Sequence, residues 1–451
     1  MRPNSYQVRP VPARGLAALT TVMVLFFVMA LVAAYTNRNL IFEQRIAANN
    51  FRSSKALNAT DAGIDWTLAM LNGGRIDDQC RPSTDTANSD FRRRYLQDVT
   101  APTKPEEVGT YRCSWGNCGI SQTGLRPACI IRNGATSCTC PTAASPNPSL
   151  TLPDDGTGTT FRVSFTKPQY AVSSAPGTIG VFVRGCANPG DSSTGCFVRS
   201  DFVDVKVDSV SMAASALGLV RALPIPPIAA LTAGSSIRAT GGIMNVANAD
   251  DSTGWTVHAP SITVTSPASS NFRGPAGSGT DGQNVDAQLL TLRGGNSAPS
   301  DAWFNSLFGM PAVTFKRQPA VVMCSNGCDQ DKLLTLIASY PRNPIWVEGD
   351  LALSSAATLG TSADPVMLVI NGNLTLSSAV NIVGFVHANN ITWGAGAQGA
   401  TLSGAMVAAT DFLSTVTTSI IYDQPVLNTI SLRYGSFVRV PGSWDVVFAP
   451  R

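Results

Sequence analysis

The sequence has little charge of either sign and very little histidine. Charged residues are 14% of its 451 residues, and 32 Lys and Arg against 29 Asp and Glu leave a formal net charge of +3. Without a basic field to attract phosphates, this composition disfavours a nucleic-acid partner. The two histidines, His258 and His387, are too far apart in sequence for a local metal pair and leave few groups for acid–base catalysis near pH 7. We therefore expect no enzyme, no cofactor and no metal site.

Charge is absent altogether between Leu16 and Tyr35. This run of twenty residues is long enough for a helix to cross a hydrocarbon core of about 30 Å. The flank before it carries Arg2, Arg9 and Arg14 and no acidic residue, and a flank of this kind stays in the cytoplasm. We expect an inner-membrane anchor with the body of the protein in the periplasm.

A cleaved signal peptide is the alternative interpretation of this run, because Val32-Ala33-Ala34 before Tyr35 resembles a cleavage box. The chain beyond it favours a retained helix, since no proline occurs between positions 12 and 82. Apolar residues also continue there at helical spacing: Phe42, Ile46, Ala56, Ala59, Ile64, Leu68 and Leu71. We predict one helix over residues 16–74, with its inner half in lipid and its outer half on protein. Gly73-Gly74 is the expected stop, because glycine adopts the left-handed turn that ends helices.

Short motifs surround the apolar run. An arginine-containing leader ends in Arg14-Gly15, the apolar helix follows at once, and residues 42–49 and 58–64 read FEQRIAAN and NATDAGI. These features resemble the PilX-type minor pilins of type IV pilus assembly. The resemblance implies that prepilin peptidase removes residues 1–15 by cutting between Gly15 and Leu16. Major pilins carry glutamate at the fifth mature position, where this chain has Thr20; PilX-type proteins also generally lack it.

The resemblance implies a structural, non-catalytic subunit that helps to initiate or cap type IV pilus assembly. Its implied partners are other minor pilins, a large pilus tip protein of the PilY type and the inner-membrane assembly platform. It would move from the inner membrane into the pilus fibre or its tip at the cell surface. The alternative is a membrane-anchored adhesion or binding module in the periplasm or at the surface, which never joins a filament.

Ten cysteines indicate disulfides, because the compartment beyond the inner membrane is oxidising. Cys186 and Cys196 flank a turn-rich loop between two strand-like runs, so we expect a bridge across that hairpin. Cys324 and Cys328 close a tight loop and are expected to pair. The other six leave their connectivity open: Cys80, Cys113, Cys118, Cys129, Cys138 and Cys140. Zinc is disfavoured, because only one short pair among them approaches the usual ligand spacing.

Strand-like alternation of apolar and polar residues occupies the middle of the chain, at 160–165 and 202–210. This pattern predicts half-buried antiparallel strands. We expect a Cys-rich β head over residues 75–223, and the resemblance implies that its sheet packs on the outer half of the long helix.

The remainder, residues 224–451, repeats loosely. A polar residue followed by an apolar one recurs at Asp350-Leu351, Asn373-Leu374, Asn390-Ile391 and Asp411-Phe412, with spacings of 23, 17 and 21 residues. This spacing predicts a parallel β-solenoid in which successive coils stack, with Asp350, Asn373, Asn390 and Asp411 forming a ladder at the turns. The expected fold class is therefore α+β: a long helix, a disulfide-rich antiparallel region and a solenoid.

One long insertion, at about 266–342, interrupts the expected solenoid. It contains helix-like segments near 302–308 and 332–338, which we expect to cap one end of the stack or cover one face. Two chemical alternatives are disfavoured. Calcium at the turn ladder or at Asp250-Asp251 lacks the glycine-rich acidic repeat. A polysaccharide-degrading site around Glu348, Asp350 and Asp364 lacks paired carboxylates on adjacent coils.

Overall fold

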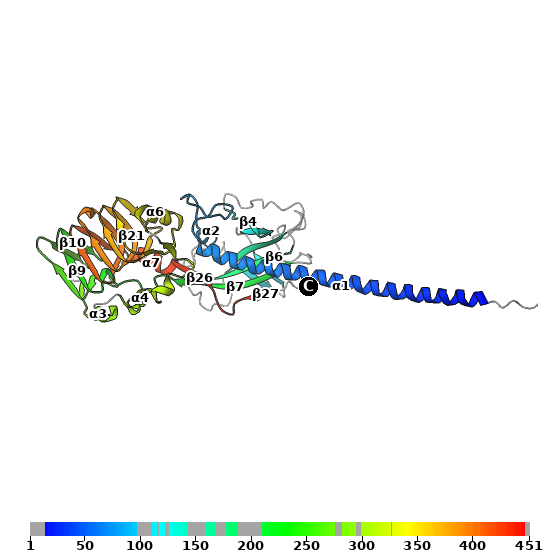
Figure 1. Ribbon diagram of the computed structural model, residues 1–451. Helices are drawn as coiled ribbons and strands as arrows, with labels where there is room; N and C mark the ends of the chain where they lie inside the picture. The colour runs from blue at the N-terminus through cyan, green and yellow to red at the C-terminus, as the bar shows by residue number, and fades with distance from the viewer. Residues whose placement is uncertain are drawn as a thin grey trace, which may run out of the picture.

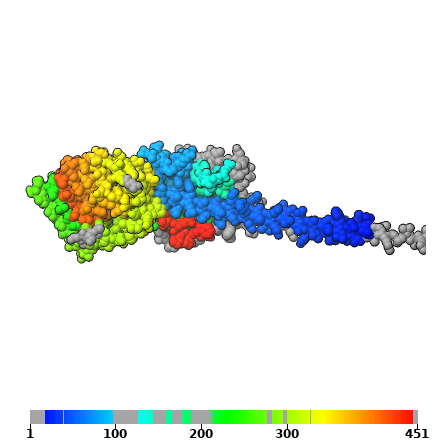
Figure 2. All heavy atoms as spheres, in the orientation of Figure 1, coloured from blue at the N-terminus to red at the C-terminus, as the bar shows by residue number. Residues whose placement is uncertain are grey.

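The molecule has three parts in a row (Figure 1). The computed structural model describes residues 14–96, 110–114, 117–121, 126–142, 158–166, 177–187, 210–275, 282–294, 299–325 and 327–446. Its parts are a long helix α1 (Arg14–Asn72), an antiparallel β head, and a C-terminal half of parallel strands. Figures 1 and 2 show α1 projecting from the head on the side away from the C-terminal half.

The head is a seven-stranded sheet on which the second half of α1 packs. Its strand order is β26-β7-β6-β5-β3-β4, and β27 also pairs with β7. The bounds are β3 (Ala128–Arg132), β4 (Ala135–Thr139), β5 (Thr159–Thr166), β6 (Thr178–Cys186), β7 (Val210–Arg221), β26 (Gly435–Arg439) and β27 (Asp445–Val446). A separate hairpin joins β1 (Thr110–Ser114) and β2 (Asn117–Ser121), and a short helix α2 (Phe91–Tyr95) follows the end of α1. The expected strands at 160–165 correspond to β5, whereas residues 202–209 lie outside the described residues.

Two strands of the head come from the end of the chain. β26 and β27 pair antiparallel with β7, which is the strand that leads into the C-terminal half. The prediction that all of residues 224–451 form one C-terminal unit is therefore wrong for residues 435–446. An exposed edge of β7 recruits these strands, and sequence distance places no limit on such pairing.

The C-terminal half consists of short parallel strands that stack in three columns. Face A contains β18 (Ala357–Leu359), the first half of β21 (Val380–Ala388), the first half of β23 (Thr401–Ala408), β25 (Thr418–Tyr422), β10 (Ile243–Ala247) and β13 (Ser269–Arg273). Face B contains β15 (Val322–Cys324), β16 (Ile345–Glu348), β19 (Val366–Asn371), the second halves of β21 and β23, β8 (Ala229–Ala233), β11 (Trp255–Ala259) and β14 (Gln283–Val285). Face C contains β17 (Leu351–Leu353), β20 (Asn373–Leu376), β22 (Asn390–Trp393), β24 (Asp411–Ser414), β9 (Ser236–Ala239) and β12 (Ser261–Val264).

Glycines mark the corner between faces A and B. Gly384 and Gly404 have φ values of +153° and +137°. A Cβ on Gly404 would lie 1.9 Å from the carbonyl oxygen of Gly384, so no side chain fits there. These residues allow β21 and β23 to turn from one face to the next while the strands stay in register.

The strands do not stack in chain order. On face C, Ser236 of β9 is in register with Asp411 of β24, and β12 follows β9. The first strands of the C-terminal half therefore stack beyond its last ones, and the expectation of sequential coils is wrong. A parallel strand edge accepts any strand with matching apolar positions, so the pattern of residues did not determine the order of the layers.

The predicted insertion at 266–342 is shorter than expected, because β13, β14 and β15 extend the stack at its two ends. The rest is helical: α3 (Gln288–Arg293), α4 (Asp301–Phe308), α5 (Ala312–Phe315) and α6 (Gln330–Ser339). The expected helices at 302–308 and 332–338 correspond to α4 and α6. After β25, α7 (Gln424–Arg433) returns the chain to the head.

Aromatic side chains from α4 and α5 cover face B from outside. Phe304 and Phe308 lie 5.7 and 5.5 Å from the ring of His387, measured between ring centroids. Phe304 also lies 6.1 Å from Trp346. His387 is 4% exposed, and burial lowers its pKa to about 4. The central strands of face B, which are β8, β19 and the second halves of β21 and β23, are buried on both sides, whereas β14 and β15 at its two ends have exposed residues.

Candidate assembly surface on the N-terminal helix

Helix α1 has 59 residues and is about 90 Å long at 1.5 Å per residue. Among the described residues, it is the one helix long and apolar enough to cross a membrane, with a mean hydropathy of 2.3 in its most apolar window and none of that window buried. Side chains from residue 18 to residue 54 are exposed, apart from Asn39, which is not described. The helix is thus a free stem followed by a docked segment.

The exposed apolar side chains continue well beyond the twenty-residue run. Outside it, large ones remain in contact with solvent: Leu40, Ile41, Phe42, Ile46 and Phe51. Phe42 is 51% and Ile46 is 59% exposed, so no part of the chain that the structure describes covers them, and the packing of these two residues on protein stays a prediction. The same prediction holds for Ala56, Ala59, Ile64 and Leu71, which are buried.

Small residues allow the docked segment to approach the head sheet closely. A Cβ on Gly63 would lie 2.6 Å from a methyl carbon of Val183, and a Cβ on Gly185 would lie 2.4 Å from the carbonyl oxygen of Ala56. The Thr60 hydroxyl donates to the carbonyl oxygens of Ala56 at 2.9 Å and Ser211 at 3.1 Å. Sequence reasoning missed this contact, although small residues at helical spacing are a recognisable signal of close packing.

The end of α1 is bonded to both halves of the molecule. The Asn72 side chain accepts from the backbone N–H of Phe437 at 2.8 Å and donates to its carbonyl at 3.0 Å. Asn343 donates to the carbonyl of Asn72 at 2.9 Å. The helix ends before Gly73-Gly74 as predicted, but neither glycine has a positive φ. A Cβ on Gly74 would lie 2.3 Å from the carbonyl oxygen of Ser339, so close approach of the C-terminal half explains this glycine.

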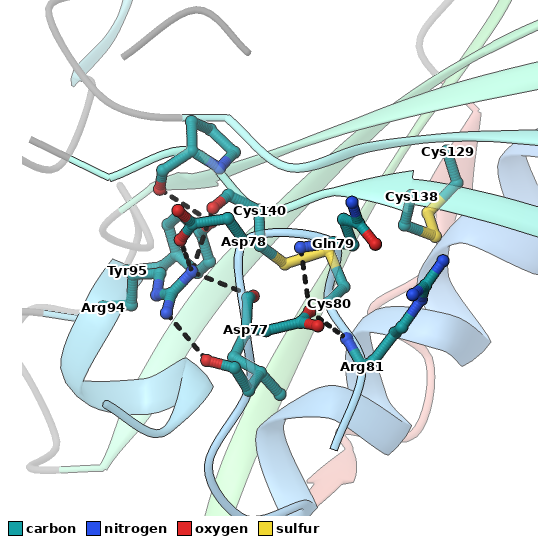
Figure 3. Close-up of a disulfide and its surroundings, with 12 residues drawn as sticks. Asp77, Asp78, Gln79, Cys80, Arg81, Arg94, Tyr95, Cys129, Cys138 and Cys140 are labelled. Atoms are coloured by element: carbon teal, nitrogen blue, oxygen red, sulfur yellow. Dashed lines mark hydrogen bonds and ion pairs between the residues drawn. A yellow bond between two sulfur atoms is a disulfide. The ribbon is translucent and has the colours of Figure 1, made fainter. Parts of the chain in front are cut away.

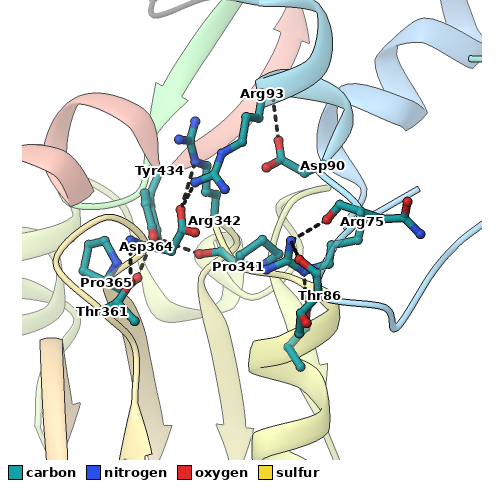
Figure 4. Close-up of polar contacts among 12 residues, drawn as sticks. Arg75, Thr86, Asp90, Arg93, Pro341, Arg342, Thr361, Asp364, Pro365 and Tyr434 are labelled. Atoms are coloured by element: carbon teal, nitrogen blue, oxygen red, sulfur yellow. Dashed lines mark hydrogen bonds and ion pairs between the residues drawn. The ribbon is translucent and has the colours of Figure 1, made fainter. Parts of the chain in front are cut away.

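Charged groups bridge the head and the C-terminal half (Figure 4). Arg93 of α2 and Arg342 both contact the carboxylate of Asp364, Arg342 with an Nε–Oδ1 distance of 3.5 Å. Arg92 is buried and donates to the carbonyls of Leu71 and Gly435. Burial lowers the pKa of Arg92 to about 10. The guanidinium keeps its positive charge at neutral pH, because the two carbonyl oxygens accept hydrogen bonds from it. Arg92 therefore links the end of α1 to β26, and Arg93 links α2 to the C-terminal half.

Three disulfides are described. Cys80 pairs with Cys140, Cys129 with Cys138, and Cys324 with Cys328. Figure 3 shows the first of them beside Arg94, which donates to the Cys140 carbonyl at 2.9 Å and to Asp78 Oδ1 at 3.1 Å. This arrangement holds the segment after α1 against the residues that directly follow β4.

The other predicted cysteines are described in part. Cys186 is disulfide-bonded, and Cys196 lies outside the described residues. The backbones of Cys113 and Cys118 face each other in the β1–β2 hairpin. No cluster of three or more His, Cys, Asp or Glu side chains suited to a metal occurs among the residues that the structure describes.

The predicted turn residues lie in one column beside face C. Asp350 Oδ1 accepts from the backbone N–H of Asn373 at 2.8 Å, and Asn373 Oδ1 accepts from Asn390 Nδ2 at 2.8 Å. Asn390 Oδ1 accepts from the backbone N–H of Asp411 at 3.3 Å. The ladder continues to Ser236, whose hydroxyl donates to Asp411 at 2.7 Å.

The carboxylates considered for catalysis have separate partners. Glu348 accepts from the indole N–H of Trp346 at 2.7 Å and from Asn371 at 3.0 Å, and these hydrogen bonds lower its pKa. Asp364 belongs to the junction with Arg93.

His258 and Asp250 also have partners close by. His258 Nε2 lies 3.5 Å from Asp286 Oδ2, and burial lowers the pKa of His258. The Asp250 carboxylate accepts from Ser252 and Thr253 within its own loop.

The predicted cleavage residues Gly15 and Leu16 lie in the first turn of α1. The leader before residue 14 is outside the described residues.

Comparison with known proteins finds a family match for the N-terminal helix. Residues 14–65 match the family model described as PilX N-terminal, so the predicted resemblance is confirmed for this segment. None of the curated proteins matches the chain. Among solved structures, it is similar to the competence-associated pilin ComZ from Thermus thermophilus, with 11% sequence identity, 88% of this chain and 97% of that chain covered, and a TM-score of 0.21. At that TM-score, the likeness supports no statement about fold or function.

Proposed function

We propose that this chain is a PilX-type minor pilin: a membrane-anchored structural subunit that joins other pilins through α1 and helps to initiate or cap type IV pilus assembly. The supporting observation is the length of exposed apolar helix. Residues 18–54 would extend about 55 Å, whereas a bilayer covers only about 30 Å. The apolar side chains between Leu40 and Phe51 therefore need a protein cover outside the membrane, and neighbouring pilin helices would supply it.

The remaining steps of the proposal follow the family. Prepilin peptidase would cut between Gly15 and Leu16, the inner-membrane platform would insert the subunit, and a pilus tip protein would contact it. The periplasmic body would leave the inner membrane for the fibre or its tip. A helix with Thr20 in place of the usual glutamate lacks the buried carboxylate that registers one subunit against the next, which suits a terminal position in the filament.

We also propose that the C-terminal half is a β-solenoid. Its support is the in-register parallel pairing of strands on three faces, with Leu351, Leu374 and Ile391 in one buried column. Each layer covers the apolar edge of the next, as expected for a stacked coil.

Substitution of the exposed stem tests assembly. Phe42→Lys with Ile46→Lys leaves folding unchanged, because both side chains are exposed, but should lower the number of pili per cell about tenfold or more, since burial of one such side chain contributes about 2 kcal/mol and about 1.4 kcal/mol is a factor of ten. Ser362→Lys with Gln398→Lys, both exposed on the C-terminal half, is the matched control and should leave piliation unchanged.

Sequencing the N-terminus of the mature protein provides the second measurement. A product that begins at Leu16 retains the stem and agrees with the proposal. A soluble product that begins at Tyr35, or full piliation in the Phe42 and Ile46 variant, would instead favour an anchored or released binding module.

A further inference from the structure

Face A carries a column of uncharged polar side chains on its outer side. One register position is occupied, layer after layer, by Thr358, Asn381, Thr401, Ser419, Asn245 and Asn271. Each is exposed or half-buried, while the residues on either side of it in the strand mostly point into the core. Strands in a sheet lie about 4.8 Å apart, so this polar column presents hydroxyl and amide groups at a regular spacing.

Hydrogen bonds between layers order several members of the polar column. The Thr401 hydroxyl donates to Asn381 Oδ1 at 2.9 Å, and Asn271 Nδ2 donates to Asn245 Oδ1 at 2.9 Å. Asn245 Nδ2 in turn donates to the carbonyl of Thr418 at 3.0 Å. Because each of these groups has further donor or acceptor capacity, a ligand meets side chains that are already positioned.

A second outward column runs beside the first and is largely apolar. It contains Val383, Ser403, Ile421, Ala247 and Arg273. Ile421, at its centre, is 49% exposed, and the Ser403 hydroxyl donates to Asp423 at 2.7 Å. Arg273 is the one formal charge in the two columns and lies in the last layer. Face A therefore presents a polar column and a largely apolar column side by side, and the charges on them are Arg273 and the Asp423 carboxylate that binds Ser403.

The other two faces differ. Face B is covered by α4 and α5. Face C is open but carries Asp350, Asp411 and Arg238 along its outer side. Figure 1 shows β10 of face A near the end of the molecule farthest from α1, where it is clear of the membrane stem and of the head.

We propose that face A binds a neutral polysaccharide. Sugar rings have hydroxyl groups that both donate and accept, together with apolar C–H surfaces, and the polar and apolar columns complement these two kinds of surface. The absence of charge in the polar column argues against anionic ligands such as polyuronides, phosphates or lipid headgroups, which need cationic partners. This site is independent of pilus assembly through the stem of α1, because the head lies between the stem and the C-terminal half (Figure 1).

The test measures retention of the full-length, detergent-solubilised protein on immobilised neutral glucans, xylan and chitin, with a polyuronide as the charged comparator. Wild type should bind at least one neutral polymer, and Asn381→Lys with Thr401→Lys should weaken that binding about tenfold or more, because two ammonium groups would replace the ordered donors and acceptors. Thr375→Lys with Thr392→Lys places the same charges on adjacent layers of face C and should bind as wild type does. Retention should also survive a rise in salt that shortens the screening length from about 10 to about 3 Å.

Several outcomes would overturn the proposal. These are no retention on any neutral polymer, equal loss in the face C variant, and preference for the polyuronide with strong salt dependence. Self-association that disappears in the Asn381 and Thr401 variant would assign face A to a second copy of this chain instead. Thermal unfolding of each variant shows whether a loss reflects the surface or the fold.

Discussion

The head and the parallel stack obtain their cores in different ways. Helix α1 covers one face of the head sheet, and its residues Ile64 and Leu71 pack there with Phe161 and Val183. The stack encloses its core between its own strands, so each layer covers the next. A sheet that depends on a single helix and on disulfides should be more sensitive to loss of a cross-link or a close contact than a stack that covers itself.

Removal of disulfides should give the largest difference between the two regions in the free energy of unfolding. Cys80→Ala with Cys140→Ala opens a closure of 60 residues in the head, which should lower the free energy of unfolding by about 4 kcal/mol from chain entropy. Cys324→Ala with Cys328→Ala opens a closure of only 4 residues at the edge of the stack, and the same relation gives about 2 kcal/mol. Denaturant unfolding of both variants checks this order, and equal losses would contradict the comparison.

A methyl group at the contact between helix and sheet should have the next largest effect. Gly185→Ala would place its Cβ 2.5 Å from the backbone nitrogen of Thr60, so we expect α1 to shift and the head to lose about 3 kcal/mol. Gly218→Ala, in the neighbouring strand β7, is the control, because its nearest atom would be 3.6 Å away. Hydrogen exchange of amides in β5 to β7 should rise in the first variant alone.

Acid should weaken the stack through His387, by a smaller amount. Above pH 6.5 the imidazole is neutral in both the folded and the unfolded chain, and stability does not depend on it. Below pH 6.5 the unfolded chain takes up a proton, whereas the folded one resists until about pH 4, so the stack should lose about 2 kcal/mol by pH 5. His387→Leu should remove this dependence from hydrogen exchange in β19 to β23. An unchanged pH response in that variant would show that another group is responsible.

Most of the helices and strands that could be predicted from the sequence were predicted from periodic patterns of residues. Apolar spacing indicated α1, and Gly73-Gly74 indicated its end. The polar–apolar repeat from Asp350 to Phe412 indicated parallel layers that the strand registers reproduce. The helices α4 and α6 were also expected from local pattern. These signals are short in range, because each depends on residues within one or two turns or one layer.

The contacts between distant segments were not predictable. Nothing in the pattern around Arg92 indicated a buried arginine that reaches the carbonyl of Gly435. The small residues of α1 signal close packing, but they do not indicate that Gly185 is the residue that contacts Thr60. The polar column of face A was not predictable either, because Asn245 and Asn381 come into one column only when the layers between them stack.

Sequence alone determined that this protein has an apolar stem continuous with its body, and that its C-terminal half repeats, because helix and strand periodicity are properties of neighbouring residues. Tertiary structure decided which strand covers which edge: β9 follows β24, and β26 returns to β7. The physical reason is that a strand edge offers the same backbone donors and acceptors to any segment of matching register, so only packing of the whole chain selects the partner.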